Sequence, residues 1–590
     1  MNDELEPMAN AMRNRRELAT SKLVPQHRLD RQGYETGDFW FGRTLSGKPF
    51  GWHEDLNLLT CAGSRAGKGV GAVIPNLLMF PGSAVVIDPK GELATITAQH
   101  RRDKLGQKVV VLDPAGVAKN IPPEMRGTFN PLAQLREDDL GVVGAAQSIA
   151  SGIVVPNPKA KDPYWDQTAL SFIQAVVLYI LHFYPPEERT LMKLRETASV
   201  GDWQLYQDFL RHMRESEDGD PNYQGSPDKA FELMLHEMAD CDAFGGLLRE
   251  EAAKIMQMGE NTRGNVLGNV RTHLDFLREP RLAPALSDNP ANPATLNLSD
   301  LRNQEKFTTV YICLPVEMMY LQGRWMRLLV MQMTQYIERT GSEFDKDSDW
   351  PILMMIDEFF QLGPLPSIEN TLTYAPGFGL RMWLIVQDIG QLKKNYPDSW
   401  ETILGACGIK QFFGINDLPT AKYLSELLGE EEVDVPSITL TKNRSETRGT
   451  NESATVGSSQ STSAGTNWSN STGGSSGFGG STGEAGGANW NSGSNSSSST
   501  GMSSSETIGT NESTTLGTSR SETEGMSKGY TVSKQTRKLV RPEEALTAFT
   551  KENLVQMLHV RDQGGMMLIR TPYYLDPDLV SLTNKRLSHE

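Results

Sequence analysis

The stretch CAGSRAGKGVGAVIPNLL, residues 61–78, decides the fold expected of this 590-residue chain. It is similar to the phosphate-binding pattern G-x-x-x-x-G-K-[ST], whose backbone N–H groups and lysine bind phosphate oxygens and whose hydroxyl holds Mg²⁺. Gly67 and Lys68 match that pattern. Ala62 stands at the first glycine position, with Gly63 beside it, and Gly69 stands at the hydroxyl position. The match is incomplete, so the flanking sequence must decide.

The flanking residues favour a phosphate loop. Residues 56–60, LNLLT, predict a short strand before the glycines, and residues 70–79 predict an apolar helix after them. This order places the positive end of a helix against an anion. A glycine-rich turn without a ligand remains the alternative. The residues expected to contact phosphate are Gly63, Ser64, Arg65, Ala66, Gly67, Lys68, Gly69 and Val70.

Composition limits the class of protein. The chain has 57 basic and 73 acidic residues and a net charge of −16. This charge excludes a protein whose whole surface binds DNA, but it allows a basic channel inside an acidic exterior. The 38% hydrophobic content and the length fit two to four domains. The four cysteines are scattered without C-x-x-C spacing, as expected for reduced thiols of a cytoplasmic protein without a zinc or disulfide framework.

The N-terminal sequence does not predict a membrane span. No segment of the chain reaches about eighteen consecutive apolar residues, and the start lacks the apolar core of a signal peptide. We therefore expect a soluble protein. Residues 1–41 are charged and predict a solvated arm, with a specific docking helix as the alternative.

The remaining sequence alternates strand-like and helix-like segments around a helical middle. Apolar strands that end at Asp88 and Asp113 are predicted within SAVVIDPKGEL (83–93) and KVVVLDPAG (108–116). Carboxylates at the carboxyl ends of apolar strands are typical of parallel sheets that bind ligands. Residues 135–303 show helical apolar spacing and predict an all-α domain inserted into an α/β domain. The predicted parts are an N-terminal arm (1–41), the first part of the α/β domain (42–134), the all-α domain (135–303), the second part (304–440), a flexible insertion (441–533) and a C-terminal completion (534–590).

The insertion 441–533 is rich in Ser, Gly, Thr and Asn and has too little apolar surface to offset the entropy of ordering. It contains a repeat, SETRGTNESATVGSS at 445 and SETIGTNESTTLGTS at 505. Two interpretations stay open, a disordered tether and a long polar hairpin whose arms are the two copies. Globular sequence resumes after it, so the insertion interrupts a domain.

Two further strands end in polar side chains. In WPILMMIDEFFQLG (350–363) the predicted strand is followed by Asp357 and Glu358. In LRMWLIVQDIGQL (380–392) it is followed by Gln387 and Asp388. In a nucleotide hydrolase the first acid organises Mg²⁺, the second polarises the attacking water, and an amide on a neighbouring strand senses the γ-phosphate. Ordinary polar strand ends are the alternative for each pair.

The motifs together resemble a known family. GSRAGKGVGAVIPNLL, VVIDPKGE, FNPL (129–132), DPYWDQTA (162–169), MMIDEFFQLG and LIVQDIGQL resemble, in family order, the coupling-protein ATPases of type IV secretion and conjugation, the TraG and TraD type. The resemblance covers about 42–442 and resumes near 537. It implies an α/β, RecA-like P-loop ATPase domain with an all-α domain, assembling as a homo-hexamer with ATP and Mg²⁺ as cofactors.

The resemblance also assigns roles to residues. It implies that Lys68 binds the phosphates, Asp357 holds Mg²⁺, Glu358 activates water and Gln387 is the sensor. Many members have G-K-G here, so Gly69 is a family trait, although without its hydroxyl the metal depends more on Asp357 and water. Some relatives carry an arginine finger where this chain has Pro376; Arg381 is a weaker candidate for that catalytic role, and a structural role for it is equally well supported.

The implied function is a coupling ATPase. It would recruit a single-stranded DNA and relaxase complex, or a secreted protein, and deliver it by ATP hydrolysis to type IV secretion channel components at the inner membrane. The family usually has an N-terminal membrane anchor, which this sequence lacks. We therefore expect either a naturally anchorless protein recruited to the cytoplasmic face of the bacterial inner membrane or a trimmed form.

Two alternatives differ in what ATP does. One is a nucleotide-gated substrate receptor with little motor activity, and the other is a DNA translocase of the same fold outside secretion. RTHLDFLREPR (271–281) is a candidate basic contact for DNA, and a solvated helix face is the favoured alternative for it.

Overall fold

A computed structural model describes residues 21–155, 163–216, 220–363, 366–450 and 518–583. The chain divides into two units. One comprises Ser21–Gly429 and Lys538–Glu590, and the other comprises Met1–Thr20 and Glu430–Arg537.

The larger unit is built on an eleven-stranded sheet with the order β2-β1-β13-β12-β9-β3-β8-β7-β4-β6-β5. All neighbours from β9 to β5 pair in parallel, whereas β12, β13, β1 and β2 extend the sheet in antiparallel fashion. The strands are β1 (Phe39–Arg43), β2 (Pro49–Trp52), β3 (Leu58–Ala62), β4 (Ala84–Ile87), β5 (Lys108–Leu112), β6 (Thr308–Ile312), β7 (Ile352–Ile356), β8 (Leu380–Val386), β9 (Ile409–Phe413), β12 (Val555–Val560) and β13 (Gly564–Ile569).

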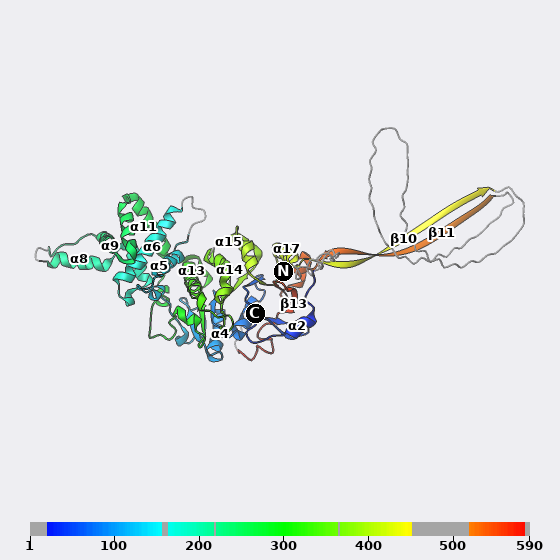
Figure 1. The fold of residues 1–590 in the computed structure, drawn as a ribbon, viewed down its shortest axis with the longest axis horizontal. Coiled ribbons are helices and arrows are strands. Elements are labelled where there is room, and N and C mark those ends of the chain that lie inside the picture. The colour runs from blue at the N-terminus through cyan, green and yellow to red at the C-terminus, as the bar shows by residue number, and fades with distance from the viewer. Residues whose placement is uncertain (1–20, 156–162, 217–219, 364–365, 451–517, 584–590) are drawn as a thin grey trace, which may run out of the picture. The chain divides into compact units, whose positions relative to one another are not determined.

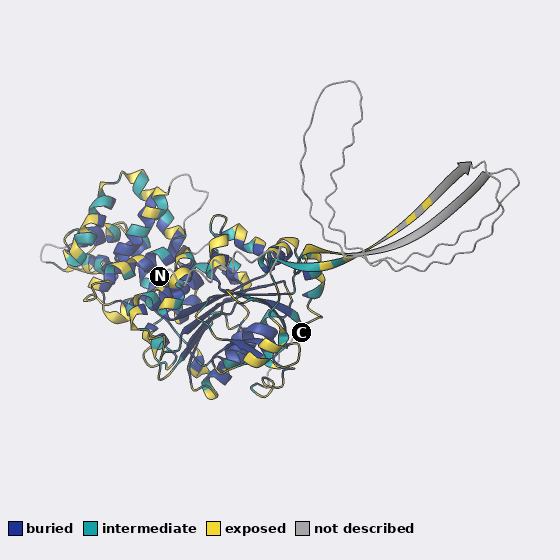
Figure 2. Cartoon of the chain, turned by 45° about the vertical axis from the view of Figure 1, so that its right-hand side comes forward, coloured by how far each residue is buried: buried dark blue, intermediate teal, exposed yellow. Residues whose placement is uncertain are grey.

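The parallel strands are buried on both faces, which explains their uninterrupted apolar sequences. In β4, Val85 and Ile87 belong to one apolar core and Ala84 and Val86 to a second core on the other face. Figure 2 shows the strands of this sheet in the buried colour. The α/β prediction is therefore confirmed for the segments on either side of the helical middle.

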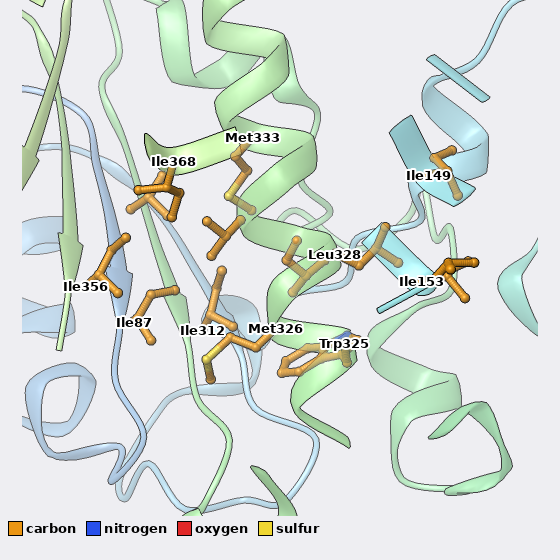
Figure 3. Packing of buried hydrophobic residues seen from close by; sticks show 14 of the residues in the cluster. Ile87, Ile149, Ile153, Ile312, Trp325, Met326, Leu328, Met333, Ile356 and Ile368 are labelled. Carbon is orange, nitrogen blue, oxygen red and sulfur yellow. The ribbon is translucent and has the colours of Figure 1, made fainter. Parts of the chain in front are cut away.

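Helices cover both faces of the sheet. Helices α3 (Ile74–Met79) and α4 (Glu92–Asp103) lie close to the glycine-rich loop 63–70 and to β4. On the other face α13 (Val316–Arg339) packs over the sheet, and Figure 3 shows its Met326 and Met333 beside Ile312, Ile356 and Ile368. The remaining helices of this region are α14 (Pro366–Tyr374), α15 (Ile389–Asn395), α16 (Trp400–Ala406), α17 (Leu418–Leu428) and α18 (Pro542–Ala548).

A block of helices lies in the chain between β5 and β6, where the sequence predicted an all-α domain. Its central helix α6 (Tyr164–Phe183) is buried at every residue from Phe172 to Leu181, because its sequence is apolar around most of the helix circumference. Leu328 of α13 packs beside Ile149 and Ile153 of α5 in Figure 3, so one apolar core joins the block to the sheet. The helices are α5 (Val142–Ile153), α6 (Tyr164–Phe183), α7 (Leu191–Val200), α8 (Trp203–Glu215), α9 (Lys229–Ala239), α10 (Leu247–Gln257), α11 (Glu260–Leu274) and α12 (Leu282–Ala285).

The stretch predicted as a charged arm, 1–41, is only partly described. Residues 1–20 lie outside the described residues, α2 (Gln26–Gln32) follows them, and β1 begins at Phe39. Phe39, Trp40 and Phe41 are buried at 1% exposure or less. The sheet thus begins shortly before residue 42, because these aromatic side chains pack into its core.

The smaller unit contains a two-stranded ribbon of β10 (Glu430–Thr450) and β11 (Thr518–Lys538), which run side by side in Figure 1. Lys534 Nζ lies 3.2 Å from a carboxylate oxygen of Glu432 across the ribbon. Pairing therefore starts eleven residues before the predicted boundary at 441. Most of both repeat copies falls in 451–517, outside the described residues, so the choice between a tether and a hairpin stays open there.

Among the described residues, no helix combines the length and apolarity required to cross a membrane.

Candidate active site

The glycine-rich stretch forms a tight loop between β3 and the following helix. Gly63 N–H donates to Gly414 O at 3.1 Å, and Ala66 N–H donates to Gly63 O at 3.2 Å. Arg65 and Gly67 adopt positive φ angles of 58° and 78°. The backbone is therefore curled into a closed turn, as the motif predicted.

The helix that follows the loop presents free donors at its start. Its first internal bond runs from Gly71 N–H to Gly67 O at 3.0 Å, and a π-helical turn, Gly69–Val73, follows. The N–H groups of Lys68, Gly69 and Val70 precede this bond and so have no acceptor within the helix. Such an end, with its positive dipole, suits a phosphate group.

Three neighbouring strands bring the predicted catalytic side chains together. Glu358, which follows β7, has Oε1 at 3.8 Å from Lys68 Nζ after β3. Gln387, which follows β8, donates from Nε2 to the other oxygen of Glu358, Oε2, at 3.1 Å. Because β3, β8 and β7 are adjacent and parallel, their carboxyl ends meet at one edge of the sheet.

Negative charge concentrates beside this contact. Burial, and then the charge of Glu358, raises the pKa of Asp357 to about 6, while Lys68 opposes the shift. On the neighbouring strand end, burial, and to a lesser degree Asp357, raises the pKa of Asp88 to about 7. Crowded carboxyl groups with raised pKa values favour a bound cation, which would relieve their repulsion.

The oxygen chemistry fits Mg²⁺ with few protein ligands. No cluster of three or more His, Cys, Asp or Glu side chains suited to a metal occurs among the described residues. Mg²⁺ is commonly held by one or two carboxylates together with phosphates and water. Glycine at position 69 offers no hydroxyl, and Asp357 and Asp88 are the buried carboxyl groups that interact at this edge of the sheet.

The structure does not bring Arg381 to this site. Arg381 lies near the start of β8, and Gln387 follows the end of the same strand. Its side chain is 2% exposed, and Nη2 donates to Asp55 Oδ1 at 2.6 Å. A buried guanidinium at the opposite edge of the sheet serves packing and an ion pair, which favours the structural alternative over an arginine finger.

The basic stretch 271–281 has partners within the chain. Arg271 Nη2 donates to Ser199 O. The Nε atom of Arg278 lies 3.3 Å from Oδ1 of Asp275, and the Nε atom of Arg281 lies 2.6 Å from Oε1 of Glu279. These contacts fit the solvated helix face that the sequence favoured.

Sequence reasoning missed Arg570, which follows β13 near the C-terminus. Its guanidinium donates to the carbonyl oxygens of Ala66 and Gly67 in the loop. The only signal in the sequence was an arginine at the end of the apolar strand GGMMLI. No local pattern connects it to a loop about 500 residues away.

Comparisons with known proteins identify the family of the chain. The model of the family described as Type IV secretory system Conjugative DNA transfer matches residues 8–460. The chain is 27% identical over 402 residues to the conjugal transfer protein TraG of Escherichia coli, covering 66% of this chain and 57% of that protein. It is 25% identical over 418 residues to protein VirD4 of Rhizobium rhizogenes, covering 70% and 54%. The chain thus spans somewhat more than half the length of these relatives.

Solved structures share the fold. The bacterial conjugative coupling protein TrwBdeltaN70, in complex with sulphate, superposes with a TM-score of 0.56 at 14% identity, covering 94% of this chain and 95% of that one. The plasmid coupling protein TrwB, in complex with ADP and Mg²⁺, gives a TM-score of 0.53 at 14% identity, covering 94% of both chains. This likeness confirms the predicted RecA-like P-loop fold with an all-α domain. Since the family model spans most of the chain, this protein belongs to the type IV secretory system conjugative DNA transfer family.

Proposed function

We propose that this chain is an ATP-hydrolysing coupling protein that delivers a substrate to a type IV secretion channel. The observation that carries the proposal is the contact series Lys68–Glu358–Gln387 at the mouth of the loop. A lysine, an acid and an amide from three adjacent strand ends are the side chains that nucleotide hydrolysis requires.

The loop residues 63–70 would hold ATP, and Asp357 would hold Mg²⁺. The N–H groups at the start of the helix suit phosphate oxygens, and Lys68 adds a mobile cation. Bound Mg²⁺ supplies charge neutralisation across the phosphates. TrwB, which shares the fold, has been solved with ADP and Mg²⁺, and this supports the assignment.

Glu358 is the proposed base for the attacking water. Glu358 forms an ion pair with Lys68, and the two side chains are 18% and 12% exposed, respectively. When Lys68 turns to the phosphates, Glu358 loses this partner but keeps the hydrogen bond from Gln387. Gln387 therefore orients one carboxylate oxygen and leaves the other to accept a proton from water.

The proposed assembly and partners follow from the family. A homo-hexamer at the cytoplasmic face of the inner membrane would pass single-stranded DNA with its relaxase, or a secreted protein, to the channel components. The all-α domain proposed for 135–303 would recruit that substrate. A finger residue would have to come from a group other than Arg381, which the fold buries against Asp55.

Two observations favour a second candidate, a nucleotide-gated receptor with little motor activity. Gly69 offers Mg²⁺ no hydroxyl, and Pro376 replaces the arginine of some relatives. Both features would slow hydrolysis without preventing nucleotide binding. Membership of the conjugative transfer family argues against the third candidate, a DNA translocase outside secretion.

The test is steady-state ATP hydrolysis by the purified chain, with and without single-stranded DNA, at low and moderate salt. A coupling motor predicts hydrolysis that DNA stimulates, that falls as salt rises, and that Lys68→Ala abolishes. Retained ATP binding without hydrolysis, together with substrate transfer by Glu358→Gln, would establish the receptor instead.

A further inference from the structure

Arg570 places a buried cation against the outer side of the phosphate loop. Its Nη1 donates to Ala66 O and, at 3.0 Å, to Gly67 O. The residue is 2% exposed, and its Cζ lies 4.1 Å from the centroid of the Phe413 ring. Phe413, the last residue of β9, lies against the guanidinium and helps to hold it with Nη1 at the two carbonyl groups.

These two carbonyl groups determine where two loop N–H groups point. In a trans peptide the C=O and N–H bonds point in opposite directions, and the described residues contain no cis peptide bond. The peptide that carries Ala66 O also carries Gly67 N–H, and the peptide that carries Gly67 O also carries Lys68 N–H. Anchoring both oxygens to Arg570 therefore turns both N–H groups to the opposite side, toward the interior of the loop.

The glycines around Lys68 make room for this side chain. A Cβ atom on Gly67 would lie 2.8 Å from Arg570 Nη1, and one on Gly71 would lie 2.7 Å from Arg570 Cγ. Gly71 is outside the phosphate-loop motif, and its small size is explained by the aliphatic part of Arg570. The same C-terminal segment also supports the loop through Tyr573 N–H, which donates to Val70 O at 2.9 Å.

We propose that Arg570 is a positioning residue of the nucleotide site, which aims the N–H groups of Gly67 and Lys68 at the phosphates. The proposal rests on the proposed nucleotide-binding function. It assigns the described part of the C-terminal segment, 538–583, a role in phosphate binding, in addition to completing the sheet. The contact joins distant parts of the chain, since Arg570 lies 504 residues from Ala66 and 503 residues from Gly67.

The test uses the full chain and the variants Arg570→Lys and Arg570→Ala. Lysine keeps the charge but not the planar donor pair or the stacking surface. Arg561→Lys is the matched control, because Arg561 is an exposed arginine of the same segment that donates to Gly405 O at 2.7 Å, away from the loop. Calorimetry gives the Mg–ATP dissociation constant, urea unfolding gives stability, and hydrogen exchange without nucleotide reports on residues 62–72.

Both Arg570 variants are expected to bind Mg–ATP about tenfold or more weakly, the effect of losing hydrogen bonds to a charged donor. Exchange in 62–72 is expected to accelerate about tenfold, beyond the change in global stability that the urea midpoint reports for the same variant. A purely structural role would lower the urea midpoint without a separate loss of affinity. Unchanged affinity, or unchanged exchange in 62–72, overturns the proposal.

A second variant guards against a folding defect in Arg570→Ala. Gly71→Ala should push the Arg570 side chain away from the loop and reproduce the affinity loss. The double variant Gly71→Ala/Arg570→Ala should bind no more weakly than Arg570→Ala alone, because the collision no longer exists. Additive losses contradict the mechanism. If the parent chain binds no Mg–ATP while exchange still responds to Arg570→Lys, the proposed function fails and Arg570 is only a structural anchor.

Discussion

Replacing Asp357 by asparagine should stabilise the protein in the absence of nucleotide while removing the proposed Mg²⁺ ligand. The fold raises the pKa of Asp357 from 3.8 to about 6, so the ionised carboxylate is less stable in the folded chain than in the unfolded one. Asparagine retains the shape and the Oδ1 that accepts from Glu358 N–H at 3.0 Å. The variant therefore removes the unfavourable charge with little change in packing.

The magnitude follows from the pKa shift. About two pKa units at about 1.4 kcal/mol each correspond to about 3 kcal/mol at pH 8. Because the folded-state pKa is raised, this carboxyl favours the fold below the unfolded pKa, and the benefit is lost as pH rises through about 6. The difference between Asp357→Asn and the parent should therefore fall by about half at pH 5, where the folded parent is mostly protonated.

The assay is urea unfolding followed by tryptophan fluorescence at pH 5 and pH 8, with EDTA and without nucleotide. Asp103→Asn is a suitable control, since an exposed ion pair with Arg102 lowers the pKa of Asp103. That variant should lose a little stability at pH 8, the opposite sign. The reasoning is refuted if Asp357→Asn is no more stable than the parent at pH 8, or if its advantage grows on acidification.

Three other substitutions test separate parts of the structure. Lys68→Ala should reduce ATP hydrolysis at least about 100-fold, measured as phosphate release, and activity within threefold of the parent would contradict its role. Arg101→Met should lower the free energy of unfolding by about 3 kcal/mol or more. The reason is the loss of a fully buried guanidinium that donates to three carbonyl groups. An unchanged urea midpoint would disprove this. Gly414→Ala should weaken Mg–ATP binding about tenfold, since its Cβ would lie 2.2 Å from that of Ala66 and its φ is +57°; calorimetry showing parental affinity would count against it.

Much of the α/β fold could be predicted from short segments. The strands around Asp88, Asp357 and Gln387 were recognisable because a parallel strand buried on both faces must be apolar throughout and polar side chains can appear only at its ends. The loop around Lys68 was recognisable because positive φ angles require glycine at few positions. The pairing of 430–450 with 518–538 was harder to place, since polar strands carry little periodic signal.

The sequence by itself determined the loop, the strand ends and the family, because these depend on local backbone preferences and on residues within one segment. The order of β3, β8 and β7 decided that Lys68, Gln387 and Glu358 meet. The tertiary structure also buried Arg381 against Asp55 and brought Arg570 to the loop from a distant part of the chain. Strand order and long-range contacts are selected by the packing of whole sheet faces, which no local segment encodes.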